Sequence, residues 1–372
     1  MRISIAELLG GIGAASNIQL SAPNRNLAER RDITTTQGGC QNAAQEFANL
    51  ITDHARADNS SQVFLVWYSD TAHYANQITR PQPEPQIAKL TAWSTLFQNT
   101  LAFREVDSQV WLVTKDGFQH LSCEPICCPA GGHSPIRLEE TEIRAHLVYR
   151  GYSTANSRAA YLRIPVATGV ARLQAITAAS EFQAEKNQLP ALHWHQKAFA
   201  TWLSNCEQVH RQQRLPAAEL GRLVAGLADT VVRDAVLLSC LPDGLPTAQG
   251  LIAEFANPGR GAASRQARNL LAPLIQQTSA VAPNPSDLRN FIKVLQAAVG
   301  HSDEAGKVAP LTLLAFLAWW QGDGTRASHR VSEALAINPS YGLAQLLTQA
   351  FHQGVKPGWL QAKALESVPQ AA

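Results

Sequence analysis

The sequence shows little excess of either charge. Its 372 residues include 31 Lys and Arg against 29 Asp and Glu, so the formal net charge is only +2. Proteins that bind nucleic acids usually concentrate basic residues on one face or along one helix. The basic clusters in this chain, such as the one from Arg211 to Arg214, are short and mixed with neutral residues. We therefore expect no nucleic-acid partner.

The sequence also lacks an apolar run of about 18 residues, the length that a membrane-spanning helix requires. Its longest apolar stretch, "APLTLLAFLAWW" at residues 309–320, has the length of a buried helix. The N-terminal residues do not combine the charged start, apolar core and cleavage site of a signal peptide. We expect no membrane partner and a cytoplasmic location, where cysteines are reduced thiols.

The first 155 residues mix helix and strand patterns. The apolar and aromatic run "SSQVFLVWYSD" at residues 60–70 predicts a strand that is buried on both faces. Residues 83–102 predict a helix, and the pair Asp116 and Gly117 between two apolar runs predicts a hairpin. This order of strand, helix, strand and strand indicates an α/β domain at residues 1–155, with a mixed sheet and helices.

Helical periodicity replaces the strand patterns from about residue 156 onward. Breaks rich in Pro and Gly separate the segments, so we predict an all-α domain at residues 156–372. Its tail predicts a helix, a Gly-rich turn, a second helix with Ala327 and Ala334 on its inner face, and a third helix after Pro339. Residues 308–341 thus resemble one tetratricopeptide unit, in which small residues allow close helix packing. We find no second copy, so this unit is either a single hairpin that caps the domain or part of a peptide-binding groove.

Three of the six cysteines lie close together in "SCEPICCPAGGHSPI", residues 122–136, directly after the predicted hairpin. A structural zinc site requires four nitrogen or sulfur ligands. Cys123, Cys127 or Cys128, His133 and His120 could supply them, but the spacing is not that of paired C-x2-C modules. We favour buried structural thiols and therefore no metal and no cofactor. Zinc and a redox thiol stay open as alternatives.

Four charged residues are candidates for contacts with a ligand. Arg158 follows the loop "GYSTANS" at the junction of the two predicted domains, and Asp70 ends the apolar strand, where α/β folds often bind ligands. Arg233 and Asp234 lie inside the apolar helix "DTVVRDAVLL". A charge in such a setting tends to be paired. The two readings are a structural ion pair and an anion contact at the domain junction.

The whole chain resembles a bacterial family of domains of unknown function, DUF4192, which is found largely in actinobacteria. The stretches that carry the resemblance include "VFLVWYSD", "CEPICCPAGGHSPI", "GYSTANSR", "VVRDAVL" and "APLTLLAFLAWWQGDG". They occur in the family's order and cover most of the chain. The resemblance implies one cytoplasmic bacterial protein with these parts. It implies no particular activity and no catalytic residues for this sequence.

No set of residues in the sequence forms a recognised catalytic signature. The stretch "GHSPI" around Ser134 lacks the last Gly of a nucleophile elbow. We therefore predict a non-catalytic protein that binds a protein or a small ligand, with a protein partner contacting the helical domain. The alternative is an enzyme or sensor with a small-ligand, zinc or thiol site near the domain junction.

Overall fold

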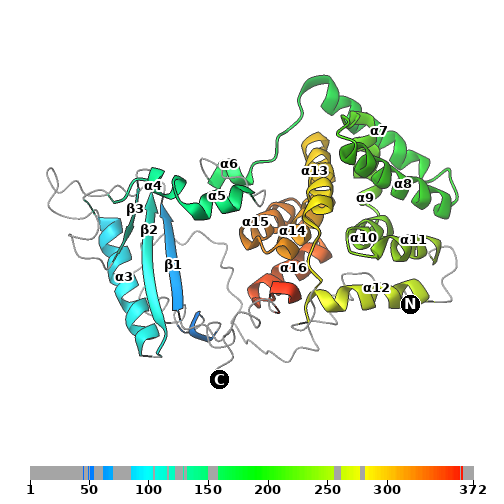
Figure 1. Cartoon of the computed structure of the whole chain (residues 1–372). Coiled ribbons are helices and arrows are strands. Elements are labelled where there is room, and N and C mark those ends of the chain that lie inside the picture. Colours follow the sequence, from blue (N-terminus) through cyan, green and yellow to red (C-terminus); the bar gives the residue numbers. More distant parts are fainter. Residues whose placement is uncertain are drawn as a thin grey trace. The chain divides into compact units, whose positions relative to one another are not determined.

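The structure of the chain is a computed structural model, and it divides into two compact units. One unit comprises residues 22–155, and the other takes in the chain from residue 156 onward. The predicted order of an α/β part followed by an all-α part is confirmed (Figure 1). The structure describes residues 45, 49, 51–53, 62–69, 85–103, 105–114, 117–121, 129, 132–149, 158–254, 261–276, 281–360 and 362.

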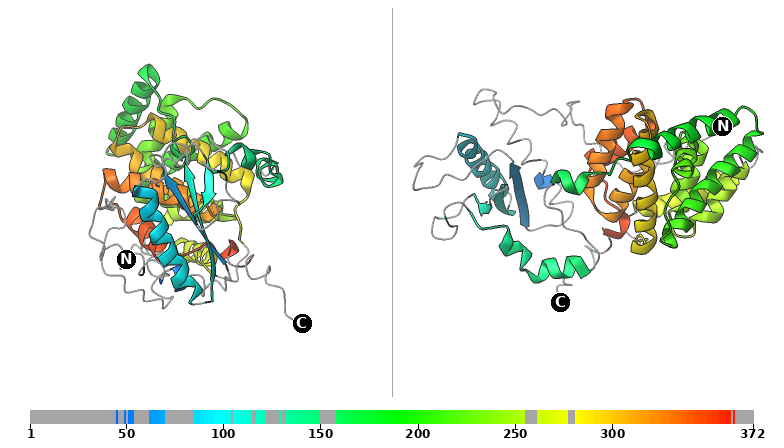
Figure 2. Two further views of the ribbon diagram at one scale, coloured as in Figure 1. Left: turned by 90° about the vertical axis from the view of Figure 1, so that its left-hand side faces the viewer. Right: turned by 90° about the horizontal axis from the view of Figure 1, so that it is seen from above.

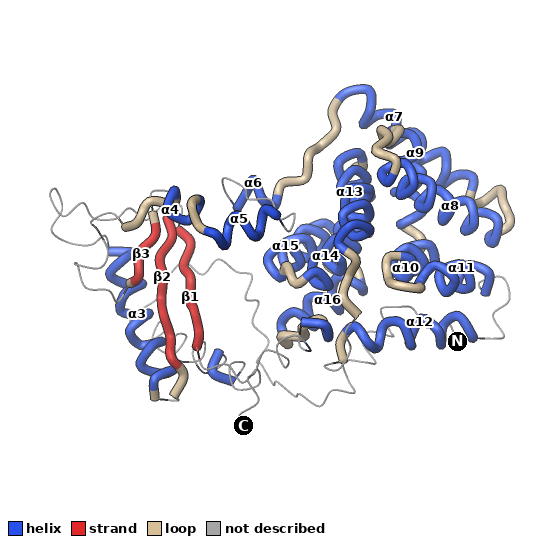
Figure 3. The backbone as a smooth tube through the Cα atoms, viewed as in Figure 1, coloured by secondary structure: helices blue, strands red, loops and turns tan. Residues whose placement is uncertain are grey.

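The α/β unit contains a mixed sheet of three strands in the order β1-β2-β3. Strand β1 (Gln62–Ser69) pairs in parallel with β2 (Asp107–Thr114), and helix α3 (Pro85–Ala102) connects them. A crossover of this length is what two parallel neighbouring strands require. Strand β3 (Phe118–His120) pairs antiparallel with β2. The predicted hairpin is therefore confirmed, and Figure 3 shows α3 beside the three strands.

Among the described residues, the core of the α/β unit lies on one side of the sheet. Phe97 and Leu101 of α3 pack with Val110 of β2, and Leu65 of β1 borders this cluster. Phe64 points to the other side and is 58% exposed. The prediction that β1 is buried on both faces is wrong, because its residues alternate between packed and exposed positions. A continuous apolar run cannot reveal which of the two faces receives a covering helix.

The chain returns to the sheet after β3. His133 pairs with Phe118, whose backbone N–H donates to the His133 carbonyl at 2.9 Å. The reciprocal hydrogen bond, from His133 to the carbonyl of Phe118, measures 2.7 Å. Two short helices follow, α4 (Ile136–Glu139) and α5 (Glu142–Tyr149). Leu121 and His133 therefore both lie beside the short hairpin of β2 and β3.

The all-α unit is built from helices that pack around one long apolar core, and Figure 2 shows them from two further sides. Short 3-10 turns η1 (Ala272–Leu274) and η2 (Ala305–Lys307) connect some of them. The described helices are α6 (Arg158–Leu162), α7 (Gly169–Glu185), α8 (Ala191–His210), α9 (Ala217–Leu227), α10 (Thr230–Ser239), α11 (Gly244–Glu254), α12 (Ala262–Leu271), α13 (Pro285–His301), α14 (Val308–Gln321), α15 (Gly324–Ile337) and α16 (Gly342–His352).

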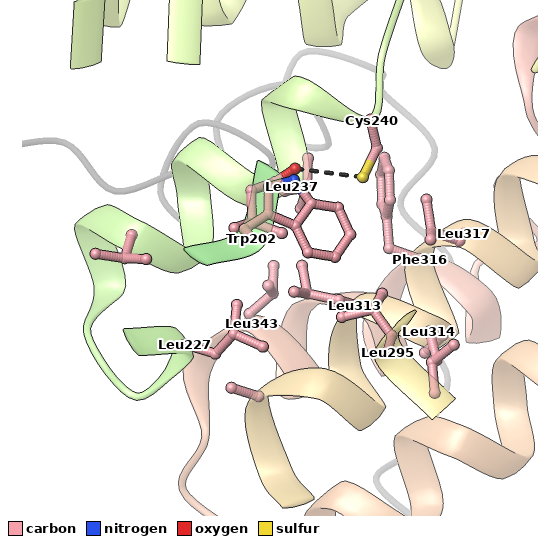
Figure 4. Packing of buried hydrophobic residues seen from close by; sticks show 14 of the residues in the cluster. Trp202, Leu227, Leu237, Cys240, Leu295, Leu313, Leu314, Phe316, Leu317 and Leu343 are labelled. Atoms are coloured by element: carbon pink, nitrogen blue, oxygen red, sulfur yellow. Dashed lines mark hydrogen bonds between the residues drawn. The ribbon is translucent and has the colours of Figure 1, made fainter. Parts of the chain in front are cut away.

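Helix α14 forms the centre of this unit. Its residues are buried continuously from Val308 to Trp320, and it contacts α9, α13, α15 and α16. Phe316 and Leu313 of α14 belong to the same buried cluster as Trp202 of α8, and Figure 4 shows these side chains. A helix that is apolar all round must be covered all round. The prediction of a buried helix at residues 309–320 is confirmed.

Helices α14 and α15 form an antiparallel pair joined by a tight turn. Gly322 ends α14 with a φ of 88°, a left-handed conformation that glycine adopts at little cost. Asp323 then caps α15, because its side chain accepts a hydrogen bond of 2.9 Å from the backbone N–H of Arg326. The inner face of α15 buries Ala327 and Ala334, as the sequence predicts. The predicted third helix is α16.

None of the helices in the described ranges is long and apolar enough to cross a lipid bilayer.

Candidate functional site

A groove lies between α7, the start of α9 and the end of α13. Its volume is about 1020 Å³, and it opens to solvent. Most of its lining is apolar, including Leu173 of α7, Leu215 just before α9 and Leu220 of α9. Concave surfaces with an apolar lining and a few polar groups are the usual form of a binding site. We take this groove as the candidate functional site.

Helix α7 is apolar on its outer side as well as on its inner side. The inner residues Ala175 and Phe182 are buried in the unit. On the outer side, Val170 and Leu173 line the groove and are 70% and 66% exposed. Val166 lies in the non-helical segment just before α7 and is 56% exposed. Apolar side chains gathered on a solvent-facing surface mark interaction sites.

The same face of α7 becomes polar toward its C-terminal end. Gln174, Thr177 and Glu181 follow Val170 and Leu173 along the groove. Residues spaced three and four apart share one face of a helix, so these five side chains form one stripe. The stripe gives the groove an apolar end and a polar end.

The other walls of the groove contribute basic groups. Arg222 of α9 pairs with Glu219, three residues earlier on the same helix. Arg214 is exposed and forms no ion pair with any of the described residues. His301 of α13 uses its Nδ1 atom in a hydrogen bond of 2.8 Å to the carbonyl of Ala297. Arg214 is therefore the basic group of the groove that remains available for an acidic partner.

Arg233 and Asp234 lie in the core of the all-α unit, each 4% exposed. The Nη2 and Nε atoms of Arg233 donate to Asp234 Oδ1 at 2.6 and 2.8 Å, and Nη1 donates to the hydroxyl of Tyr341 at 3.1 Å. Burial lowers the pKa of Arg233, but Asp234 and Tyr341 outweigh burial and raise it above its ordinary value. The expected ion pair is present within α10, and the hydrogen bond from Arg233 to Tyr341 joins α10 to the start of α16.

A second, partly buried charge network surrounds the N-terminus of α10. Asp229 caps this helix by accepting hydrogen bonds from the N–H groups of Val231 and Val232 at 2.9 and 3.4 Å. Its other partners are Lys186 Nζ at 2.8 Å and His195 Nε2 at 3.2 Å. Burial raises the pKa of Asp229, but His195 and Lys186 outweigh burial and hold it well below its usual value. The network therefore keeps a carboxylate charged where α7, α8 and α10 meet.

Cys206 and Cys240 are free thiols in the all-α unit. Burial raises the pKa of both thiols, and the neighbouring Cys206 adds to the rise at Cys240. Cys240 Sγ also lies 3.3 Å from the carbonyl of Val236. A thiol needs a lowered pKa to act as a nucleophile or a redox group. These two cysteines are packing residues of the core.

Several of the predicted site residues lie outside the described residues. Asp70 and the three cysteines Cys123, Cys127 and Cys128 are among them. Arg158 begins α6, but its side chain is not described either. The structure therefore leaves the predicted ligand contacts of these residues as predictions.

The two histidines near the cysteine segment lie beside β2 and β3. His133 Nδ1 is 2.9 Å from Nη1 of Arg137, and its ring packs against Phe118. The ring of His120 meets the edge of Trp111 at a centroid distance of 5.2 Å. Within the part of the chain that the structure describes, no three His, Cys, Asp or Glu residues are grouped as a metal site. The cysteines fall outside that part, so the zinc alternative stays a prediction.

Comparison with known families agrees with the resemblance noted in the sequence. The chain matches the model of a domain of unknown function, DUF4192, over residues 20–358. The chain belongs to the DUF4192 family. The DUF4192 match takes in both units, from β1 to α16. No curated protein and no solved structure matches the chain.

The groove residues of this DUF4192 protein were not among the residues predicted from the sequence. Val170 and Leu173 lie in "GVARLQAITAASEF", where apolar residues occur on every side of the helix. The distribution of these apolar residues around the helix could have indicated a binding surface, because a helix with apolar residues on both sides needs a cover on both sides. Arg214 belongs to a basic cluster that the sequence marks as ordinary surface.

Proposed function

We propose that this protein is a non-catalytic binding module whose all-α unit receives a segment of a partner protein in the groove of α7, α9 and α13. The observation that carries the proposal is the exposure of Val170 and Leu173 along a groove of about 1020 Å³. Apolar residues at spacings of three and four match the anchors that one amphipathic helix offers another. The partner segment is therefore an amphipathic helix.

The charges of the groove favour a partner with an acidic residue beside its apolar face. Arg214 has no ion-pair partner among the described residues, whereas Arg222 is already paired with Glu219. The first turn of α9 lines the groove at Ala217 and Ala218, and a helix N-terminus carries a partial positive charge. An acidic side chain opposite Arg214 would be attracted both by the Arg214 guanidinium and by the partial positive charge at the N-terminus of α9.

The experiment is done in cells with the full-length chain, in which a photo-crosslinking amino acid replaces Leu173. A second chain carries the same amino acid in place of Gln183 as the matched control. Gln183 is exposed on the same helix and does not line the groove. We expect one protein to crosslink at residue 173 and not at residue 183. That protein is then purified, and its affinity is measured for Val170→Lys, Leu173→Lys and Gln183→Lys.

Each of the first two substitutions should weaken binding at least tenfold. Burial of a Val or Leu side chain contributes about 1.5–3 kcal/mol, and tenfold in affinity corresponds to about 1.4 kcal/mol. Gln183→Lys should leave the affinity unchanged. Equal crosslinking at both positions, or equal affinities for all three variants, would overturn the proposal. A small molecule retained by the wild type and lost from Leu173→Lys would instead identify the groove as a ligand site.

Other parts of the proposal rest on the sequence. The resemblance to the family supports a cytoplasmic bacterial protein, and the scattered basic residues support the absence of a nucleic-acid partner. The small residues of α15 and its tight turn support a tetratricopeptide-like hairpin at residues 308–341. We also propose that the α/β part and the all-α part are separate domains, divided near residue 156.

The alternative function, an enzyme or sensor with a zinc or thiol site, depends on the cysteine segment. Metal analysis of reduced, purified protein tests it directly. Stoichiometric zinc that disappears in Cys123→Ser would favour this alternative. A metal-free protein that binds its partner would favour the binding module.

A further inference from the structure

Residues 158–168 cross the all-α unit as a strap. The strap consists of α6 and the six residues that lead to α7. It lies against α15 and the end of α13, and its contacts involve both side chains and backbone. Leu162 is only 6% exposed, so the strap is docked rather than loosely attached.

Tyr161 is the main side-chain anchor of the strap. Its hydroxyl donates a hydrogen bond to the Asp323 carboxylate, at the N-terminus of α15. The guanidinium of Arg326 lies over its ring, 3.9 Å from the centroid. A cation over an aromatic face and a hydrogen bond to a carboxylate are two separate attractions. The start of α15 therefore recognises a tyrosine by both its ring and its hydroxyl.

Arg330 forms a hydrogen bond with the backbone of the strap. It lies one turn beyond Arg326 on α15, and it is only 3% exposed. One terminal nitrogen donates to the carbonyl of Leu162, and the other donates to Glu333 at 2.5 Å. The strap carbonyl thus satisfies a buried charged group, which is costly to leave without a partner.

The far end of the strap lies close to the backbone of α13. The N–H of Ala167 donates to the carbonyl of Gly300 at 2.8 Å. A Cβ atom on Gly300 would lie 2.3 Å from the carbonyl oxygen of Pro165, so only glycine admits the strap there. The contact surface accordingly selects a tyrosine, a buried apolar residue and then an extended segment.

We propose that this surface of α13 and α15 is a peptide-binding site that the chain fills with its own strap. The partner that it fits is a peptide with a tyrosine followed by an apolar residue and an extended stretch. Such a peptide competes with the strap for Asp323, Arg326 and Arg330. This site uses contacts different from those of the groove, so it stands independently of the proposed function.

The proposal needs a surface that holds its shape when the strap leaves. The inner face of α15 is packed on α14 through Ala327, Val331 and Ala334, all of which are buried. The strap contacts a different stripe of α15, formed by Asp323, Arg326 and Arg330. The pair α14 and α15 therefore keeps its own core while the strap is displaced.

The test uses a fluorescent synthetic peptide of residues 157–168 and the full-length chain. In the wild type the attached strap fills the site at a high effective concentration, so the peptide should bind poorly. In a full-length chain with Tyr161→Ala and Leu162→Ala the site is open, and the peptide should bind at least tenfold more tightly. Adding Asp323→Asn and Arg330→Met to that chain should abolish binding, whereas adding Leu173→Lys should not.

Circular dichroism and the thermal midpoint establish that each variant is folded. Equal binding by wild type and the open variant, or binding by neither when both are folded, would overturn the proposal. If the open variant does not fold, Tyr161→Phe removes only the hydroxyl. Trypsin cleavage after the exposed Arg163 should then be about tenfold faster than in the wild type, and added peptide should accelerate it further. Cleavage that the peptide does not change would also overturn the proposal.

Discussion

The contact between α7 and α9 depends on Gly221. An added Cβ atom at this position would lie 2.0 Å from the backbone oxygen of Ala175 on α7. Ordinary van der Waals contact begins at 3.4 Å, so α7 and α9 would have to separate by more than 1 Å. We predict that Gly221→Ala destabilises the protein, although the same change in an open helix is stabilising.

The size of the effect follows from two opposing contributions. Alanine in a helix interior is more stable than glycine by about 0.5–1 kcal/mol. Overpacking of a close contact costs about 1–3 kcal/mol, and a clash with backbone belongs at the upper end of that range. The net loss should be about 2 kcal/mol. For a unit of this size, that lowers the thermal midpoint by about 4–8 °C.

Gly250 provides a matched control in the same unit. It also lies inside a helix, α11, but the nearest atom to an added Cβ is the Cβ of Ala263 at 3.5 Å. Gly250→Ala should therefore raise the free energy of unfolding by about 0.5–1 kcal/mol. Thermal and urea unfolding of both full-length variants, followed by circular dichroism, measures the difference.

The test compares the signs of the changes in unfolding free energy caused by Gly221→Ala and Gly250→Ala. If Gly221→Ala stabilises the protein as much as Gly250→Ala does, then α7 and α9 do not approach each other at Gly221 as described. The groove would then lose its geometric basis as well, because α7 and the start of α9 form two of its walls.

Three further predictions concern buried and partly buried polar groups of the all-α unit. Asp229→Asn should lower the free energy of unfolding at pH 7. The folded-state pKa of Asp229 lies below the unfolded value of about 3.9, so its contribution is complete above that value and is lost as the pH falls below it. The difference in unfolding free energy between the two proteins, measured by urea titration, should therefore begin to shrink as the pH falls below about 4, and a difference that stays constant would contradict the network. Arg233→Met should lower the free energy of unfolding by about 3–5 kcal/mol, because it leaves Asp234 buried and charged. The double variant Arg233→Met, Asp234→Leu should recover most of that loss. An equal loss of unfolding free energy in the single and the double variant would refute the ion pair. Cys206 and Cys240 should resist iodoacetamide at pH 8 until urea unfolds the chain, and mass spectrometry showing rapid native alkylation would contradict their raised pKa values.

Local patterns in the sequence predicted the elements of the fold well. The hairpin around Gly117 follows from turn chemistry, and the helices α14 and α15 follow from periodicity broken by Gly322. These signals act over a few residues, so one sequence contains them completely. The ion pair of Arg233 and Asp234 was also predictable, because a charge inside an apolar helix must find a partner.

Contacts between distant segments were not predictable in the same way. Tyr161 meets Asp323 across 162 residues of sequence, and Arg330 meets the carbonyl of Leu162 across 168. No spacing rule connects such residues, because only the packing of the intervening helices brings them together. The exposed side of β1 was missed for a related reason. Phe64 and Leu65 are equally apolar, and only the position of α3 decides which is covered.

At the groove, the apolar pattern of α7 and the exposure of its side chains differ. Apolar residues on all sides of α7 would normally indicate a helix covered on all sides. In the structure, Ala175 and Phe182 are covered, whereas Val170 and Leu173 are not. Exposure of these two side chains costs free energy that the folded chain does not recover by itself. A partner that covers them would recover it, and this difference is the physical reason to look for the partner at this groove.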